Sequence, residues 1–298
     1  MKPTIIIFLC GLAAALIAFA ISASRTIQSD PVDPANAEQA VRRSLWRHPR
    51  LIRFLRERMD RKSAGGFLLT ASLLVLFVVS IFTGLMLDMI DNHTGFAAAD
   101  KSLAAWGSGH STSATAHAMK WITQLGSTVV IVAALLITAC VDYFRRRSRE
   151  VFVFVAAIGI GELVLNNLLK VIVKRDRPPV FHQLVVVHGY SFPSGHTVAA
   201  ASCWMAIALV LGRDKSRLVR ATLAGGAALI AVSVAASRAL LGVHWLSDVI
   251  AGLIIGWGWF TIVAIIFGGR AQRLGDPVAD HPQGVATADR APEHATSR

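Results

Sequence analysis

Long apolar stretches alternate with short polar and basic linkers along most of the chain. The apolar runs that are long enough to span a membrane are 5–23, 66–90, 127–144, 151–173, 196–212, 221–237 and 248–268. A helix needs about 20 apolar residues to cross the hydrocarbon core, and unpaired backbone groups are not tolerated there. The pattern therefore predicts an all-α integral membrane bundle, with a six-helix core and an extra N-terminal hydrophobic helix.

Composition agrees with a membrane protein. The chain has 298 residues, of which 54% are hydrophobic and 16% charged, and its mean hydropathy is +0.55. Soluble domains carry about 25% charged residues. These values exclude a disordered chain, a disulfide scaffold and a typical cytosolic enzyme. The net charge of +12 would suggest nucleic-acid binding in a soluble protein, so the position of the basic residues matters.

The basic residues gather in the linkers 42–62, 145–150 and 213–220. Positive residues stay on the cytoplasmic side of a membrane, and these linkers alternate correctly if the six core helices begin and end inside. The remaining linkers, on the outer side, are 91–126, 174–195 and 238–247. We interpret the charge as a topology signal with attraction to anionic lipid, and we expect no nucleic-acid partner.

The sequence divides into three parts. Residues 1–65 form a hydrophobic anchor and a basic cytoplasmic or interfacial segment, 66–268 the six-helix core, and 269–298 a disordered cytoplasmic tail. Run 5–23 resembles a signal peptide, but cleavage would leave the basic stretch outside, so we interpret it as a retained anchor. Stretch 50–62 fits a helix on the inner leaflet and a solvated linker equally well.

Three polar clusters stand out at the ends of the apolar runs, all on the outer side. They consist of Lys170 with Arg177-Pro178, Pro193-Ser194-Gly195-His196, and Ser237-Arg238 with His244 and Asp248. Linker 174–195 also breaks the charge rule, since Lys174, Arg175 and Arg177 lie on the wrong side of the membrane. An anionic ligand at this face would explain these cations.

The residue types in the clusters suit a phosphate group. Arginine matches phosphate oxygens bidentately and lysine adds a point charge, and Ser194-Gly195 precedes a helix start whose N–H groups favour an anion. His244 and Asp248 are four residues apart, so they share a helix face, and a carboxylate on one ring nitrogen leaves the other free to attack. His196 can protonate the leaving oxygen and later activate water.

No acidic cluster that would hold Mg²⁺ or Zn²⁺ is visible in the sequence. The cations of the three clusters can neutralise a phosphate in place of a metal ion. We therefore predict a reaction that needs neither a metal nor a cofactor.

The clusters resemble the three-part signature of the type 2 phosphatidic acid phosphatase family, which is K-x6-RP, PSGH and SR-x5-H-x3-D. The matching positions are Lys170, Arg177, Pro178, Pro193, Ser194, Gly195, His196, Ser237, Arg238, His244 and Asp248. The resemblance covers about 66–268. Each cluster alone would more often be structural, but three matching blocks on one side of the membrane are highly specific.

The resemblance implies roles for these residues. His244 would be the nucleophile that forms a phosphohistidine, Asp248 would orient it, and His196 would be the general acid. The positions implied to bind phosphate are Lys170, Arg177, Ser194, Gly195 and Arg238. Membrane members of the family act on lipid phosphates and diphosphates at the outer face, whereas the apolar runs make the soluble haloperoxidase branch a poor match.

The sequence therefore predicts a lipid phosphatase of the cytoplasmic (inner) membrane with an extracytoplasmic active site. Undecaprenyl diphosphate, phosphatidylglycerol phosphate, phosphatidic acid and lipid A phosphate all remain candidate substrates. A phosphotransferase using the same phosphohistidine and a non-catalytic transporter or scaffold are the rival hypotheses. The sequence does not indicate an oligomeric state.

Other polar residues carry weaker signals. Glu162 and Asn166 recur with Lys170 every four residues, so they should face the bundle interior, and we favour packing over substrate contact. Trp257 and Trp259 are interpreted as packing or interface residues. The histidines outside the signature are interpreted as solvent-facing or gating residues: His93, His110, His117, His182 and His188.

Overall fold

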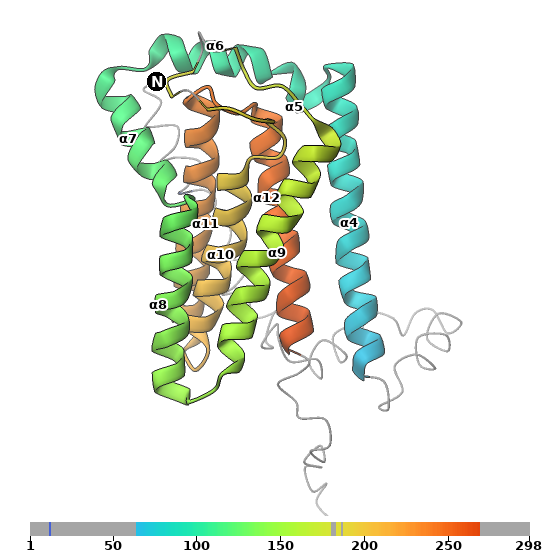
Figure 1. Cartoon of the computed structure of the whole chain (residues 1–298), viewed down its shortest axis with the longest axis vertical. Helices are drawn as coiled ribbons and strands as arrows, with labels where there is room; N and C mark the ends of the chain where they lie inside the picture. Colours follow the sequence, from blue (N-terminus) through green and yellow to red (C-terminus); the bar gives the residue numbers. More distant parts are fainter. Residues whose placement is uncertain (1–11, 13–63, 180–182, 186, 269–298) are drawn as a thin grey trace, which may run out of the picture.

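The computed structural model describes residue 12 and residues 64–179, 183–185 and 187–268, and every regular element in these residues is a helix. The long helices are α4 (Ala64–Asn92), α8 (Thr128–Arg146), α9 (Glu150–Val173), α10 (Gly195–Gly212), α11 (Arg217–Leu240) and α12 (Leu246–Gly268). They run side by side as a bundle (Figure 1). The predicted all-α fold is confirmed.

Six spans within the described residues are long and apolar enough to cross a membrane. They correspond to the six core runs, so the chain is a multi-pass membrane protein. Of the predicted N-terminal helix 5–23 only residue 12 is among the described residues, and the stretch 50–62 and the tail 269–298 lie outside them. The division of the chain into three parts stays a prediction.

The helices extend beyond the apolar runs that predicted them. The clearest case is α11, which covers Arg217–Leu240 where the apolar run covers 221–237. The Ser216 side chain accepts a hydrogen bond from Val219 N and so begins the helix four residues earlier. At the other end, Arg238 belongs to the last turn of the helix rather than to a loop.

The linker 91–126 is largely helical. It contains α5 (Gly95–Ala98), α6 (Asp100–His110) and α7 (Ser113–Gln124), and α6 lies across one end of the bundle (Figure 1). A capping box between Thr112 and Thr115 begins α7. These helices are short and only partly apolar, so a search for membrane spans does not detect them. We call this end of the bundle the site end.

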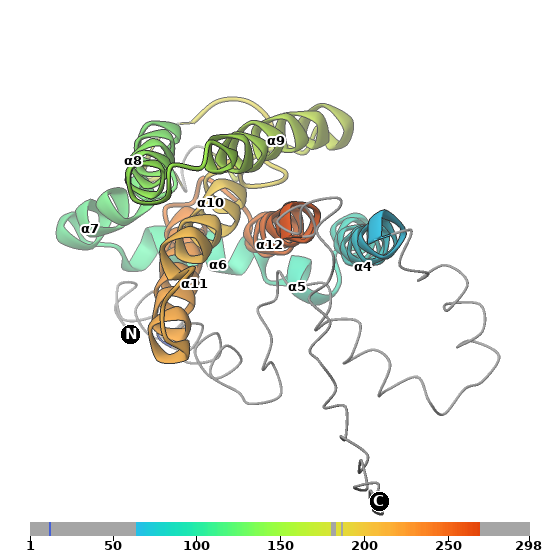
Figure 2. The same cartoon turned by 90° about the horizontal axis from the view of Figure 1, so that it is seen from below.

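Helix α10 lies at the centre of the bundle, where α8, α9, α11 and α12 all pack against it (Figure 2). In its most apolar stretch 67% of the residues are buried, compared with 6% in the span Ser72–Ala98, which covers most of α4. Small residues on α10 and α12 allow close packing, because Gly256 of α12 lies against the backbone of Val198.

Charged residues join two helix connections at the other end of the bundle. Arg146 near the end of α8 contacts Asp142 at 2.9 Å and Asp214 at 2.7 Å. Asp214 lies in the short connection between α10 and α11. We call this the basic end, since the linkers 145–150 and 213–220 both lie there.

Substitution of Gly256 should test the close approach of α10 and α12. A Cβ atom at Gly256 would lie 2.6 Å from Val198 O and 2.7 Å from Ala201 Cβ, whereas a Cβ atom at Gly226 would meet nothing within 4 Å. We expect Gly256→Ala to destabilise the protein by about 1–3 kcal/mol through overpacking. Gly226→Ala should be neutral or stabilising, because alanine favours the helix. Thermal unfolding in detergent measures both, and equal midpoints would contradict the packing described.

Candidate active site

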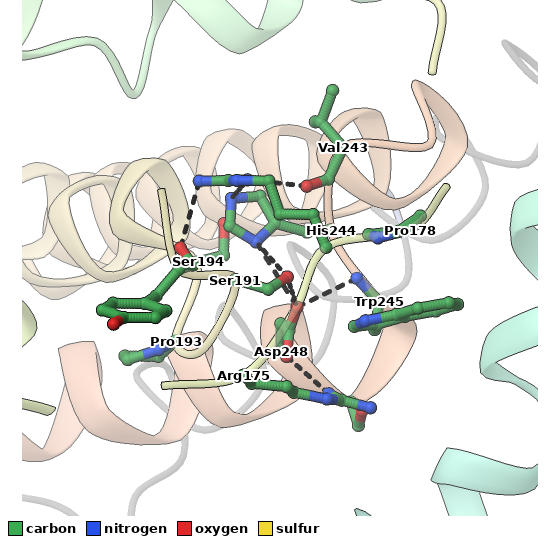
Figure 3. Close-up of polar contacts among 12 residues, drawn as sticks. Arg175, Pro178, Ser191, Pro193, Ser194, Val243, His244, Trp245 and Asp248 are labelled. Carbon is green, nitrogen blue, oxygen red and sulfur yellow. Dashed lines mark hydrogen bonds and ion pairs between the residues drawn. The ribbon is translucent and has the colours of Figure 1, made fainter. Parts of the chain in front are cut away.

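The three predicted clusters meet at the site end of the bundle (Figure 3). Lys170 comes from the last turn of α9, Ser194 and His196 from the start of α10, and Arg238 from the last turn of α11. The loop between α11 and α12 brings His244, and the first turn of α12 brings Asp248. Residues separated by up to 78 positions in the sequence therefore surround one site.

His244 and Asp248 face each other at the centre of the site. Nδ1 of His244 lies 3.4 Å from Oδ2 of Asp248. The residue His244 is 3% exposed and Asp248 is fully buried. A carboxylate removed from water in this way needs several donors to satisfy its oxygens.

Asp248 obtains those donors from three directions. Nη1 of Arg175 donates to Oδ1 at 2.5 Å, and the backbone N–H of Trp245 donates to Oδ2 at 3.0 Å. The hydroxyl of Ser191 also donates to Oδ2. Both carboxylate oxygens are therefore occupied, which fixes the orientation of the carboxylate toward His244.

Arg177 lies against the opposite nitrogen of the His244 ring. Its Nη1 is 3.1 Å from Nε2 of His244 and donates to the carbonyl of Val243 at 2.7 Å. Because a guanidinium has no acceptor atom, Nε2 must be the acceptor in this contact. The proton of the neutral ring therefore sits on Nδ1, toward Asp248, and the Nε2 lone pair points toward the cations.

Lys170 secures the loop that precedes α10. Its Nζ donates to the carbonyls of Tyr190 at 3.0 Å and Pro193 at 2.9 Å. Arg177 adds a hydrogen bond from Nη2 to the same Tyr190 carbonyl, at 3.2 Å. Lys170 and Arg177 therefore converge on one loop segment beside the His244 ring.

The N-terminus of α10 opens into the site. Ser194 is fully buried and its N–H donates to the backbone carbonyl of Asp248 at 3.3 Å. The first N–H groups of a helix have no partner within the helix, so they are available to an anion. Gly195 leaves this approach open, while a Cβ atom there would lie 3.0 Å from Nδ2 of Asn166.

Arg238 is a buried cation with an unused donor. The residue is 5% exposed, and its Nη1 lies 3.4 Å from Oγ1 of Thr123. Its Nε has no hydrogen-bond partner among the described residues. His196, which is partly buried, lies close enough to Arg238 and Lys170 for their charges to act on it. An anion in this site would satisfy the free donor and offset the gathered positive charge.

Sequence reasoning missed several residues that contact the predicted site. Arg175 was noticed only as a cation on the wrong side of the membrane, whereas it binds Asp248 directly. Nothing in the sequence marked Ser191, or Asp100 of α6, which accepts a hydrogen bond from Arg175 at 2.7 Å. Only the folded arrangement brings these residues to Asp248.

The residues with weaker signals take mostly structural positions. Glu162 and Asn166 are 7% and 6% exposed, which confirms that their helix face points into the bundle. Trp259 packs in the core and donates to Ile158 O at 3.2 Å. The described histidines outside the signature are all exposed, namely His93, His110, His117 and His188, while His182 lies outside the described residues.

Electrostatics at the site keeps the His244 ring neutral. Burial lowers the pKa of the His244 imidazole from its ordinary value of 6.5 to about 4. Asp248 raises this pKa, while the charges of Arg238 and Arg177 lower it. His244 is therefore unprotonated at neutral pH, as a nucleophile must be.

The protein is a multi-pass helical bundle that gathers cations and a histidine–aspartate pair at one end. Such a site suits a phosphate group. The PAP2 superfamily model matches residues 150–271, which contain all three clusters. The chain resembles phosphatidylglycerophosphatase B of Bacillus subtilis, with 33% identity over 150 residues, covering 49% of this chain and 71% of that protein. It also resembles lipid A 1-phosphatase of Rhizobium etli, with 31% identity over 132 residues, covering 41% of this chain and 52% of that protein.

A solved structure has the same fold. It is the crystal structure of a transmembrane PAP2 type phosphatidylglycerolphosphate phosphatase from Bacillus subtilis, with a TM-score of 0.59 and 28% identity. The match covers 66% of this chain and 98% of that chain. The chain therefore belongs to the PAP2 superfamily. It is a membrane phosphatase, a hydrolase that acts on phosphoester bonds.

The protonation of His244 can be measured directly. We expect its ring to titrate near pH 4 in protein labelled with ¹³C-histidine, with His244→Ala used to assign the NMR signal. Asp248→Asn should lower the pKa further, because it removes the negative charge that favours the imidazolium. The signal of the exposed His117 serves as an internal reference. A His244 ring that titrates near the ordinary histidine value of 6.5 would contradict the burial and charges described.

Proposed function

We propose that the protein hydrolyses a lipid phosphate or lipid diphosphate through a phosphohistidine on His244. The observation that carries this proposal is the placement of the His244 ring between two kinds of partner. Its Nδ1 faces the buried carboxylate of Asp248, while its Nε2 lies 3.1 Å from the guanidinium of Arg177. A lone pair held beside phosphate-binding cations is suited to in-line attack on phosphorus.

In the first step Nε2 of His244 forms a bond to phosphorus as the bond from phosphorus to the leaving oxygen breaks. His196 donates its proton to that oxygen, so the alcohol or phosphate leaves without an added negative charge. Asp248 stabilises the positive charge that develops on the His244 ring. The charge on the equatorial oxygens of the transferred group is neutralised by Arg177, Arg238 and Lys170.

In the second step water attacks the phosphohistidine. His196, now unprotonated, takes a proton from the water, and the bond from Nε2 to phosphorus breaks. Inorganic phosphate leaves and both histidines return to their starting states. The backbone N–H of Gly195, the first residue of α10, contributes a donor to the phosphoryl oxygens in both steps, and the Ser194 hydroxyl contributes another.

The cations give a reason to propose a reaction without a metal. Arg238 is buried with an unpartnered donor, and Arg177 and Lys170 lie at the same site. Together they supply the positive charge that a divalent ion supplies in other phosphatases. No cofactor takes part in either proposed step.

The substrate class is proposed from the position of the site and from the relatives. The site lies at the ends of spanning helices, where lipid headgroups reside, and the relatives are named for phosphatidylglycerophosphate and lipid A. We propose a lipid phosphate or diphosphate as substrate. The contacts described recognise the phosphate rather than the lipid tail, so undecaprenyl diphosphate, phosphatidylglycerol phosphate, phosphatidic acid and lipid A phosphate remain candidates.

We propose that the site faces the extracytoplasmic side of the cytoplasmic membrane. The support is the position of the linkers 145–150 and 213–220, which carry most of their charge as arginine and lysine and lie at the basic end. The basic end belongs in the cytoplasm by the positive-inside rule. The site end, at the other ends of the same helices, is then extracytoplasmic.

A panel of lipid phosphates tests the proposed activity. We expect the purified protein to release inorganic phosphate from at least one of them in the presence of EDTA. His244→Ala should reduce the rate by about a thousandfold or more, as loss of a nucleophile does. His117→Ala, which removes an exposed histidine of α7, should retain the activity. Absence of phosphate release from every lipid would favour a transporter or scaffold, and activity that survives His244→Ala would remove the assigned nucleophile.

Rapid quenching tests the intermediate. With ³²P-labelled lipid phosphate we expect a protein-bound label that is labile in acid and stable in base, on the peptide that contains His244. Asp248→Asn should slow its formation, because the imidazolium charge is no longer stabilised. Label recovered as free phosphate supports hydrolysis, whereas label that appears on a second added lipid would identify a phosphotransferase.

A further inference from the structure

Arg175 connects the site to a helix that carries no part of the phosphatase signature. Its Nη1 donates to Asp248 Oδ1 at 2.5 Å, and its Nη2 donates to Asp100 Oδ2 at 2.7 Å. The side chain is 14% exposed, while those of Asp100 and Asp248 are 3% and 0% exposed. One guanidinium therefore bridges two buried carboxylates, as Figure 3 shows for Arg175 and Asp248.

Asp100 also binds the start of α12. Its Oδ1 accepts the backbone N–H of Ser247 at 2.9 Å, and its Oδ2 accepts the Ser247 hydroxyl at 2.7 Å. The Ser247 hydroxyl is in turn 2.7 Å from Nη1 of Arg175. Asp100 thus acts as a helix cap supplied from α6, and it holds the turn that carries Asp248.

These contacts constrain both oxygens of Asp248. Arg175 occupies Oδ1, so Oδ2 is the oxygen turned toward Ser191, Trp245 N and the His244 ring. The guanidinium carbon of Arg175 lies over the Trp245 ring, 5.6 Å from the centroid of the ring. This contact restricts the arginine side chain from another side. Without Arg175 the carboxylate would lose its only described cationic hydrogen-bond partner and could rotate.

We propose that Asp100 and Arg175 are positioning residues of the active site, which fix Asp248 so that His244 keeps its Nδ1 proton and presents Nε2 to the phosphate. Helix α6 is then a functional part of the site rather than a linker. Asp100 lies outside the region matched by the family, residues 150–271. The catalytic consequence rests on the proposed function, but the effect on the His244 ring does not.

A purely structural latch between α6 and α12 is the competing explanation. Such a latch would affect folding or stability and leave the ionisation of His244 unchanged. If Arg175 instead positions Asp248, its removal should change the pKa of His244, because Arg175 neutralises part of the Asp248 charge. The charged or titratable groups that act on His244 are Asp248, Arg177, Arg238 and His196. All four are unchanged in the variants below, so a change in the His244 titration reports the loss of Arg175 or Asp100.

The experiment compares Arg175→Gln, Arg175→Lys, Asp100→Asn and the double variant Asp100→Asn/Arg175→Gln in the full chain. Lys101→Gln and Asp176→Asn are the matched controls, since each removes one exposed charge near the site. The first readout is the NMR titration of His244, which needs no substrate. The second is kcat and KM for a lipid phosphate, with thermal unfolding in detergent as the check on folding.

We expect Arg175→Gln to raise the pKa of His244 by about half a pH unit or more, because more of the Asp248 charge then favours the imidazolium. We expect kcat to fall by about tenfold to a hundredfold with little change in KM, as for a misplaced catalytic group. Arg175→Lys should recover part of the loss. Asp100→Asn should lower kcat in the same way but less, without raising the pKa of His244, because Arg175 then keeps its whole charge beside Asp248. The kcat of the double variant should match that of Arg175→Gln alone. Both controls should behave like the native protein.

An unchanged His244 titration in folded Arg175→Gln would overturn the proposal, as would additive effects of the two substitutions. If Arg175→Gln does not fold, the titration of the double variant Asp100→Asn/Arg175→Gln, which also lacks the guanidinium, decides by the same criterion. If the native protein hydrolyses no lipid phosphate, the proposed function fails, while the titration still decides whether Asp100 and Arg175 position the His244–Asp248 pair.

Discussion

The burial of one carboxylate, Asp248, constrains the architecture of the site. A fully buried charge is costly unless donors surround it. Asp248 obtains them from Arg175 and Ser191 in the loop before α10, from the Trp245 backbone and from His244. Segments that are distant in the sequence must therefore meet at this point for the protein to fold stably. The same requirement places the His244 ring next to the guanidinium of Arg177, one of the cations proposed to bind phosphate.

Close helix packing makes this meeting possible. Gly252 of α12 lies against Thr197 and the Ser194 carbonyl, and Gly256 lies against Val198, so α10 and α12 approach without intervening side chains. Their N-termini consequently lie side by side, and the Ser194 N–H reaches the carbonyl of Asp248. Without a strong hydrophobic driving force between helices in lipid, small residues are the usual means of such an approach. Packing in the membrane core thus determines the geometry at its surface.

The spans and the signature residues could be predicted from the sequence because each leaves a local pattern. Apolar length identified all six core helices, and fixed spacings identified residues such as Lys170, Arg177 and His244 that the fold brings to one end. Their catalytic roles remain predictions. Helix α6 could not be found by apolar length, since it is short and lies across the bundle end. The contacts of Asp100 and Ser191 could not be seen in the sequence because they depend on tertiary pairing across up to 147 positions.

The weak burial of α4 has a consequence for how the protein meets its bilayer. Only 6% of the residues in its most apolar stretch are buried, and the long helix that it packs against is α12. Tilting α4 to accommodate a thinner or thicker bilayer would therefore change its contacts with α12 and leave the packing around α10 in place. Mismatch with the surrounding lipid can be absorbed at this edge, while α10 and the helices around it keep their spacing.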